Sequence, residues 1–349
     1  MGRPSQVVKT AIGSIMSSPE VLSPSLRATL AEVGDCLKRG RPFELGLSAK
    51  LDELHELAPS AVVRAEREIV EVAELFHRRE GSLPWRRSND LKSLARVEGL
   101  EYVLVFHRNG YVREAALRKI AGGLPSAFAF ASIAWRLNDW VEPVRAAAVE
   151  CAARSFGCTA PEVVARAALV LLVRETSWGR WGAEKAAFED ALDRPEVSEK
   201  LFQVIVRQTT GPTAKALRFA LRKPRLDGYL VEIASQAKQP EVRALAAKTL
   251  IEGAATWSSG WRYRWIDKSM GIRRPEPIIA QRSIAGSPDR DGIVAACARD
   301  KAAAVRNLAV ASLISFSLGT DRARTLAATL TQDRSRAVRE RAEFILRQA

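Results

Sequence analysis

Apolar residues along most of the chain recur at steps of three and four positions, the spacing that places them on one face of an α-helix. Gly, Pro, Asn or Asp stands at the joins between these segments and marks the helix ends. Clear examples are PSAFAFASIAWRLND, PEVVARAALVLLVRE and EVSEKLFQVIVRQ. No segment shows a sustained alternation of apolar and polar residues between turn signals, so the pattern predicts an all-α fold.

A phrase with Val-Arg near the start of an alanine-rich helix returns five times. Its copies are NGYVREAALRKIAG, NDWVEPVRAAAVECAA, QPEVRALAAKTLIEG, RDKAAAVRNLAVASLI and QDRSRAVRERAEFILR. The gaps between successive arginines are 32, 98, 63 and 33 residues, close to one, three, two and one periods of 30-odd residues. Segments 182–195, 211–224 and 274–286 keep the apolar spacing without Val-Arg and fill the missing periods. We predict about eight helix pairs over residues 91–349, because such a pair hides its apolar face only against its neighbours.

These units resemble HEAT repeats, in the short bacterial form also found in phycobilin-lyase-like proteins. The resemblance rests on the motif Asp-x4-Val-Arg, which occurs three times in the chain. It implies an α–α superhelix in which the aspartate ends the first helix of a unit, the arginine opens the second, and successive pairs form a structural ladder. The ladder residues are then Asp139, Arg113, Arg145, Arg243, Asp300, Arg306, Asp333 and Arg339. Ala214, Ile278 and Glu184 stand at the arginine position of other units and depart from the pattern.

Residues 1–90 lack the repeat phrase. Apolar spacing there predicts helices at roughly 4–17, 24–39, 43–57 and 60–79. A repeat array needs polar-faced ends to avoid association, so this region is interpreted as an N-terminal helical cap. A separate docking module is the alternative.

Charge is unevenly distributed along the chain. Of the net +14, residues 1–200 contribute almost nothing, with 28 basic and 27 acidic residues, whereas residues 201–349 hold 26 basic and 13 acidic residues. This asymmetry indicates either an anionic partner for the C-terminal half or an arginine-rich surface that is simply solvated. The candidate binding residues are Lys215, Arg218, Arg222, Lys223, Arg225, Arg262, Arg264, Lys268, Arg273 and Arg274. The first three share one side of a predicted second helix, and the last two precede Pro275, which would start another helix.

The stretch WSSGWRYRWIDKSMGIRR, residues 257–274, mixes aromatic and basic residues. Trp257, Trp261 and Trp265 are spaced by four, so on a helix they form one stripe that packs between neighbouring units. A grouping of Trp261, Tyr263 and Trp265 alternating with arginines would need an extended strand. In a helical array we expect the helix, with the tryptophans buried.

Signals for chemistry are sparse. The three histidines, the four scattered cysteines and the acidic residues form no metal, nucleophile or nucleotide-binding motif, so no cofactor or metal is expected. HEAT-like DNA glycosylases use aromatic residues and a catalytic aspartate, and residues 176–193 offer Trp178 and Trp181 with Glu184 and Asp190. That family's local motif is missing, so no catalytic residue is assigned.

These observations predict a non-catalytic interaction scaffold that binds a protein partner with an acidic surface. The alternative is nucleic-acid binding by a basic groove in units four to six, and a glycosylase is a third possibility. No apolar run reaches the length of a membrane span and the N-terminus lacks a signal core, so a cytoplasmic protein is expected.

Overall fold

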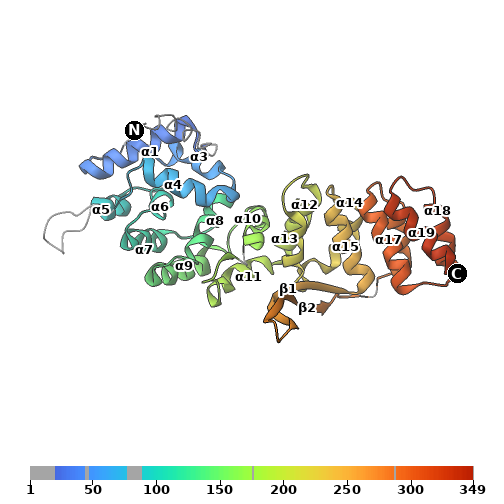
Figure 1. Ribbon diagram of the computed structural model, residues 1–349. Coiled ribbons are helices and arrows are strands. Elements are labelled where there is room, and N and C mark those ends of the chain that lie inside the picture. Colours follow the sequence, from blue (N-terminus) through green and yellow to red (C-terminus); the bar gives the residue numbers. More distant parts are fainter. Residues whose placement is uncertain (1–19, 44–46, 77–88, 175–176, 287, 349) are drawn as a thin grey trace, which may run out of the picture. The chain divides into compact units, whose positions relative to one another are not determined.

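The computed structural model describes residues 20–43, 47–76, 89–174, 177–286 and 288–348. They belong to two compact units, residues 1–120 and 121–349 (Figure 1). The domain boundary predicted near residue 90 falls inside the first of these units. The predicted helix at 4–17 lies outside the described residues.

The first unit is helical. Its elements are α1 (Pro24–Arg39), α2 (Leu47–Lys50), α3 (Asp52–Glu56), η1 (Pro59–Ala61), α4 (Val62–Val72), α5 (Asn89–Arg96), α6 (Glu101–Leu104) and α7 (Gly110–Lys119). The long helix α1 matches the prediction because its ends are well capped: the Ser23 hydroxyl accepts a hydrogen bond from the Leu26 N–H at 3.0 Å, and Gly40 ends the helix with φ 62°. Helix α1 packs against α4, and α7 packs against α5 and α6.

The second unit contains twelve α-helices and a two-stranded sheet within the described residues. The helices are α8 (Ala127–Arg136), α9 (Glu142–Ser155), α10 (Pro161–Arg174), α11 (Ala186–Leu192), α12 (Pro195–Arg207), α13 (Thr213–Ala220), α14 (Leu230–Gln236), α15 (Pro240–Glu252), α16 (Arg290–Ala298), α17 (Ala303–Phe316), α18 (Asp321–Leu330) and α19 (Arg336–Arg347), with the short turns η3 (Ala183–Lys185) and η4 (Pro224–Tyr229). Pro161, Pro195 and Pro240 each begin a helix, where the missing N–H is not needed. No helix in the described ranges is long and apolar enough to span a membrane.

The helices pack in two series. Helices α13, α15, α17 and α19 lie against one another in order, and α8, α10, α12 and α14 do the same. The shared faces of α15 to α19 form a core of small and branched residues such as Ala247, Val305, Ala309 and Val338. Apolar spacing therefore predicted correctly that neighbouring pairs bury each other's faces.

The prediction of helix throughout is wrong at residues 254–283. They form the antiparallel strands β1 (Ala254–Asp267) and β2 (Ile272–Ser283), between α15 and α16. The segment 274–286 is consequently not a helical unit. The 63-residue gap between Arg243 and Arg306 spans one unit plus the hairpin, and α15 packs directly against α16 and α17.

The repeated arginine makes the same contacts at all five positions. Its Nη1 donates to the carbonyl oxygens of the residues six and five positions earlier, at the end of the preceding helix or turn. For Arg243 these acceptors are Ala237 at 2.7 Å and Lys238 at 3.2 Å. Arg113, Arg145, Arg306 and Arg339 repeat this geometry. The carbonyls at a helix end lack partners within the helix, so each arginine fastens the two helices of a pair.

Arg243 and Arg306 also bind the aspartate of the following unit. Arg243 binds Asp300, and Arg306 binds Asp333, each through Nε and Nη2 at 2.6–2.8 Å. Asp139 accepts a hydrogen bond from Arg136 at 2.8 Å within its own unit. One carboxylate oxygen of each of these three aspartates, Asp139, Asp300 and Asp333, also accepts a hydrogen bond from the backbone N–H two residues later. The aspartate is thus held by the turn that it belongs to.

Candidate functional site

Most residues of the hairpin β1–β2 are exposed. Its strands pair from Ala254 with Ser283 to Asp267 with Ile272, with irregularities after Ser258 and after Trp265. In Figure 1 it lies beside α13 and α15 with its turn directed away from them. The turn closes because Asp267 Oδ1 accepts the backbone N–H groups of Ser269 and Met270 and Gly271 adopts φ 68°.

The base of the hairpin is fixed by one arginine. Arg282 donates to the carbonyl oxygens of Leu221 at 2.8 Å and Lys223 at 2.7 Å, and its two terminal nitrogens bind the Asp227 carboxylate at 2.8 and 2.6 Å. Asp227 also accepts the Ala285 N–H at 2.9 Å. These bonds tie the end of β2 to η4 and to the turn after α13. The hairpin therefore projects from a rigid base.

The outer edge of β2 is blocked by two prolines. Pro275 pairs with Tyr263, and Pro277 pairs with Trp261. A proline has no N–H to give to the partner strand, so both stand where the backbone nitrogen faces the outer edge. That edge lacks two donors and cannot pair well with another strand.

The two faces of the hairpin differ in chemistry. One face carries Trp261, Tyr263 and Trp265, with Pro277, Pro275 and Arg273 opposite them. The other carries Arg262 opposite Glu276 and Arg264 opposite Arg274. Arg262 is paired with Glu276 at 3.1 Å. Within the described residues no carboxylate lies within 4.0 Å of Arg264 or Arg274, and the two like charges face each other directly.

Sixteen large apolar or aromatic side chains are exposed in the described ranges, and half of them lie on this hairpin. They are Trp261, Tyr263, Trp265, Ile266, Met270, Ile272, Ile278 and Ile279. The expectation that the tryptophans form a buried stripe is therefore wrong for Trp261 and Trp265, which are 68% and 48% exposed. Such a concentration is typical of surfaces that contact another molecule, so the hairpin is the candidate site.

The remaining predicted binding residues lie around α13 and do not form one free basic stripe. Helix α13 ends at Ala220, so Arg222 falls in the following turn, where its guanidinium stacks 4.4 Å from the Phe219 ring centre. Lys215 lies 5.8 Å from the same ring centre, and Arg218 is exposed.

Lys223 and Arg225 are neutralised by acidic residues, contrary to the predicted extension of the stripe. Lys223 binds Asp193 at 2.7 Å, and the buried Arg225 binds Asp193 at 2.9 Å and Glu189 at 2.5 Å. Burial tends to raise the pKa of Glu189, but the hydrogen bond and charge of Arg225 outweigh it and hold that pKa below its ordinary value. The stripe therefore reduces to Lys215 and Arg218, with Arg222 on Phe219.

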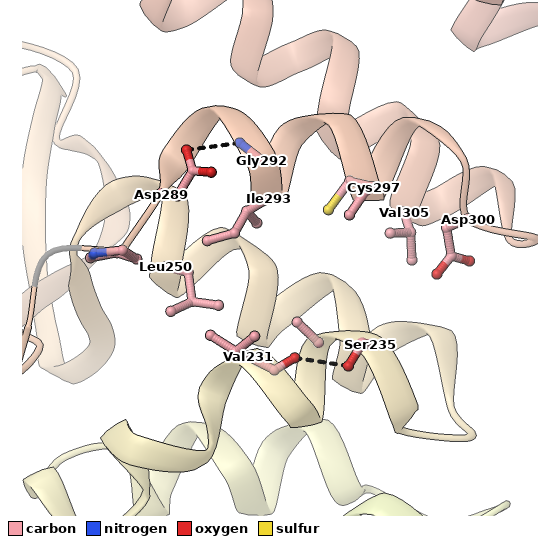
Figure 2. Close-up of a pocket in the computed structure, with 12 residues that line it drawn as sticks. Val231, Ser235, Leu250, Asp289, Gly292, Ile293, Cys297, Asp300 and Val305 are labelled. Carbon is pink, nitrogen blue, oxygen red and sulfur yellow. Dashed lines mark hydrogen bonds between the residues drawn. The ribbon is translucent and has the colours of Figure 1, made fainter.

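A second feature is an apolar cleft of about 460 Å³ at the junction where the hairpin is inserted. Figure 2 shows Val231 of α14, Leu250 of α15 and Ile293 of α16 directed into it. Its polar groups are already engaged: Asp289 accepts the Gly292 N–H at 3.0 Å and Asp300 binds Arg243. Burial raises the pKa of the Cys297 thiol to about 11, so this thiol is protonated at neutral pH. The cleft can hold an apolar group.

The stretch that suggested a glycosylase has a structural role. Trp178 and Trp181 are 8% and 5% exposed, and their rings meet edge to face with centres 4.5 Å apart. Glu184 faces Arg145 at 3.8 Å. Rings buried in this way cannot stack on a base. No group of three or more His, Cys, Asp or Glu suited to a metal ion occurs in the described part of the chain.

Comparison of the chain with protein-family models, with curated proteins and with solved structures found no match.

The sequence indicated the hairpin's arginines as candidate binding residues. It did not reveal that Trp261 and Trp265 are exposed or that Arg282 binds Asp227 at the base of the hairpin. Arg282 and Asp227 gave no signal, because they are 55 residues apart in the chain. The alternation of aromatic and basic residues at 261–265 was the available sign of a strand.

Proposed function

We propose that the protein is a HEAT-like α-solenoid that binds nucleic acid through the β1–β2 hairpin. The solenoid is supported by the consecutive packing of helix pairs and by the arginine that fastens the two helices of a pair at five positions. The hairpin interrupts this regular array. The hairpin has 30 residues and is exposed beyond its base, so most of it does not help to hold the helices together. An exposed segment of this kind favours a role in binding another molecule.

The observation that carries the proposal is the direct opposition of Arg264 and Arg274. Like charges facing each other across an antiparallel pair destabilise the pair. Both side chains are exposed, and no carboxylate of the described residues lies close enough to offset the repulsion between them. An anion bound between the two guanidinium groups would remove the repulsion at Arg264 and Arg274.

The anion that fits best is a phosphodiester. Arg264 and Arg274 border a hollow of about 560 Å³ together with Trp265, Ile266 and the segment 275–277. The guanidinium group presents parallel N–H donors that match phosphate oxygens. The hairpin has six basic and two acidic residues, a net charge of +4 that attracts a polyanion.

The test is binding to labelled DNA and RNA of about 20 nucleotides, single-stranded and duplex, at increasing salt. The affinity should fall steeply as salt rises. The double variant Arg264→Ala/Arg274→Ala should lower the affinity at least tenfold, about 1.4 kcal/mol, and reduce the slope of log K against log salt by about 1.5.

Arg322→Ala/Arg336→Ala is the matched control, since it removes the same charge from exposed positions on α18 and α19. It should bind like the unmodified protein. Equal losses in the two double variants, or no binding at low salt, would refute the proposal.

A protein partner is the second candidate, and the apolar cleft favours it. Val231 is 57% exposed at its rim, and a partner's apolar side chain would bury the cleft walls. Once a partner is identified by cross-linking, Val231→Asp should weaken its binding while leaving nucleic-acid binding unchanged. A partner that binds the variant equally well does not use the cleft.

A further inference from the structure

The aromatic face of the hairpin has ring surfaces open to a ligand. Trp261, Tyr263 and Trp265 are 68%, 61% and 48% exposed, and no ring contact joins them in the described part of the chain. Pro277 and Pro275 lie opposite the first two. Proline is short and rigid, so it gives the face an apolar floor without filling the space above.

The spacing of these rings suits flat ligands. Side chains two residues apart on a strand project from the same face about 6.6 Å apart, twice the rise per residue. Bases in a nucleic-acid strand stack about 3.4 Å apart. The gap between Trp261 and Tyr263, or between Tyr263 and Trp265, is therefore wide enough for one base between two rings.

One such position is already occupied by a planar group of the protein itself. The guanidinium of Arg273 lies 4.3 Å from the Tyr263 ring centre and 6.0 Å from that of Trp265. Within the described residues Arg273 has no carboxylate within 4.0 Å. The contact shows that the face accepts a stacked planar group, and it leaves the positive charge of Arg273 available to a phosphate.

We propose that this face binds unpaired bases, so that the ligand is single-stranded nucleic acid. The inference rests on the function proposed above and names its ligand class. Bases stack on Trp261, Tyr263 and Trp265, while Arg264 and Arg274 bind the phosphates. In a duplex each base is already covered above and below, so its flat surfaces cannot reach the rings.

A lipid surface fits the hairpin less well. Ile266, Met270 and Ile272 are exposed near the turn, as in a loop that enters a bilayer. The turn between them also carries Asp267 and Lys268, whose charges such a loop would have to bury at considerable cost. The three rings are spread along β1 and do not gather at the tip.

The experiment compares three probes on the full chain: a single-stranded oligonucleotide of about 12 residues, its duplex, and the same strand with abasic sites in place of its bases. The intact single strand should bind at least tenfold more tightly than the duplex and the abasic strand. Binding should also quench tryptophan fluorescence, and Trp261→Phe/Trp265→Phe should remove most of that change.

The variants separate stacking from charge. Trp261→Ala/Tyr263→Ala/Trp265→Ala should weaken binding to the single strand about 100-fold, whereas the corresponding triple Phe variant should retain most of the affinity. The abasic strand tests the same point on unmodified protein, should the alanine variant fold poorly.

Two results would overturn the inference in distinguishable ways. Equal binding of single strand, duplex and abasic strand would mean phosphate contacts alone, which refutes base stacking but leaves the proposed function standing. Binding of vesicles of phosphatidylcholine with about a quarter phosphatidylglycerol, without binding of any nucleic acid, would refute both and identify a membrane-binding hairpin.

Discussion

Arg243 binds Asp300 through two parallel hydrogen bonds, Nε to Oδ2 at 2.7 Å and Nη2 to Oδ1 at 2.8 Å, although 57 residues separate them in the chain. The hairpin lies within that interval, yet the two residues pair as neighbouring units do elsewhere, as Arg306 and Asp333 show. The stacking of the helix pairs therefore continues past the insertion.

Arg243→Met should destabilise the protein by about 3–5 kcal/mol, because it leaves the partly buried Asp300 carboxylate without its cation. The variant also loses the bonds to the carbonyls of Ala237 and Lys238. Urea unfolding followed by circular dichroism measures the change. Arg336→Met is the control, since its pair with Glu340 is exposed, and its unfolding midpoint should hardly move. Similar midpoints for the two variants would show that the buried pair does not stabilise the fold.

The aspartates of this ladder should make the protein sensitive to acid. Hydrogen bonds from Arg306 hold the pKa of Asp333 below its ordinary value of 3.8. Burial acts in the opposite direction at Asp300, but the bonds from Arg243 and the Ala302 N–H outweigh it and also lower that pKa. A carboxylate with a depressed pKa stabilises the fold above its ordinary pKa, and this contribution is lost as pH falls through the folded value.

Urea midpoints should thus stay nearly constant from pH 7 to about 5 and fall below about pH 4. The fall should be smaller in Arg306→Met, in which Asp333 has lost its cation. An equally steep fall in that variant would place the acid-sensitive groups elsewhere.

Arg282→Met should loosen the base of the hairpin while leaving the residues of its aromatic and basic faces in place. Its guanidinium joins Asp227 to the carbonyls of Leu221 and Lys223, so amide hydrogens in β1 and β2 should exchange faster in the variant. Binding to the single strand should weaken because the faces are no longer held in place. Arg262→Met, which removes only an exposed pair with Glu276, should leave amide exchange near the base unchanged. Unchanged amide exchange in β1 and β2 of both variants would show that Arg282 does not hold the base of the hairpin.

Thiol reactivity should single out Cys158. It is exposed, whereas Cys36, Cys151 and Cys297 are buried. Burial also raises the pKa of the Cys151 and Cys297 thiols to about 11. A thiol reagent at pH 8 should label one cysteine quickly, and Cys158→Ser should abolish that phase. Four thiols should react once the protein is unfolded in urea. Rapid labelling of more than one cysteine in the folded protein would contradict the described packing.

The sequence predicted the helix pairs well because their signal is repeated. The apolar spacing recurs because each helix pair buries one face against its neighbours. The Val-Arg phrase recurs because the arginine binds the carbonyls of the preceding turn, at Arg113, Arg145, Arg243, Arg306 and Arg339. The HEAT resemblance implied a ladder of aspartates and arginines, and in the structure Arg243 binds Asp300 and Arg306 binds Asp333.

The hairpin was predicted wrongly because its sequence fits two periods at once. Trp257, Trp261 and Trp265 satisfy the helical spacing, while Trp261, Tyr263 and Trp265 satisfy the alternation of a strand. The surrounding array favoured the helix. Pro275 and Pro277 were the stronger local signal, since two prolines so close together within one segment exclude a helix interior there. No local pattern could reveal the exposure of the rings, which depends on what packs against the hairpin.

The two ends of the hairpin meet at one hydrogen bond, in which the Ile284 N–H donates to the Gly253 carbonyl at 3.1 Å. Gly253 ends α15 with φ 69°, and the chain resumes the array within a few residues of Ile284. An appendage with touching ends can be gained, lost or exchanged through a short splice without disturbing what it is mounted on. The hairpin can therefore be replaced by another segment at the Gly253–Ile284 joint while the helices on either side keep their packing.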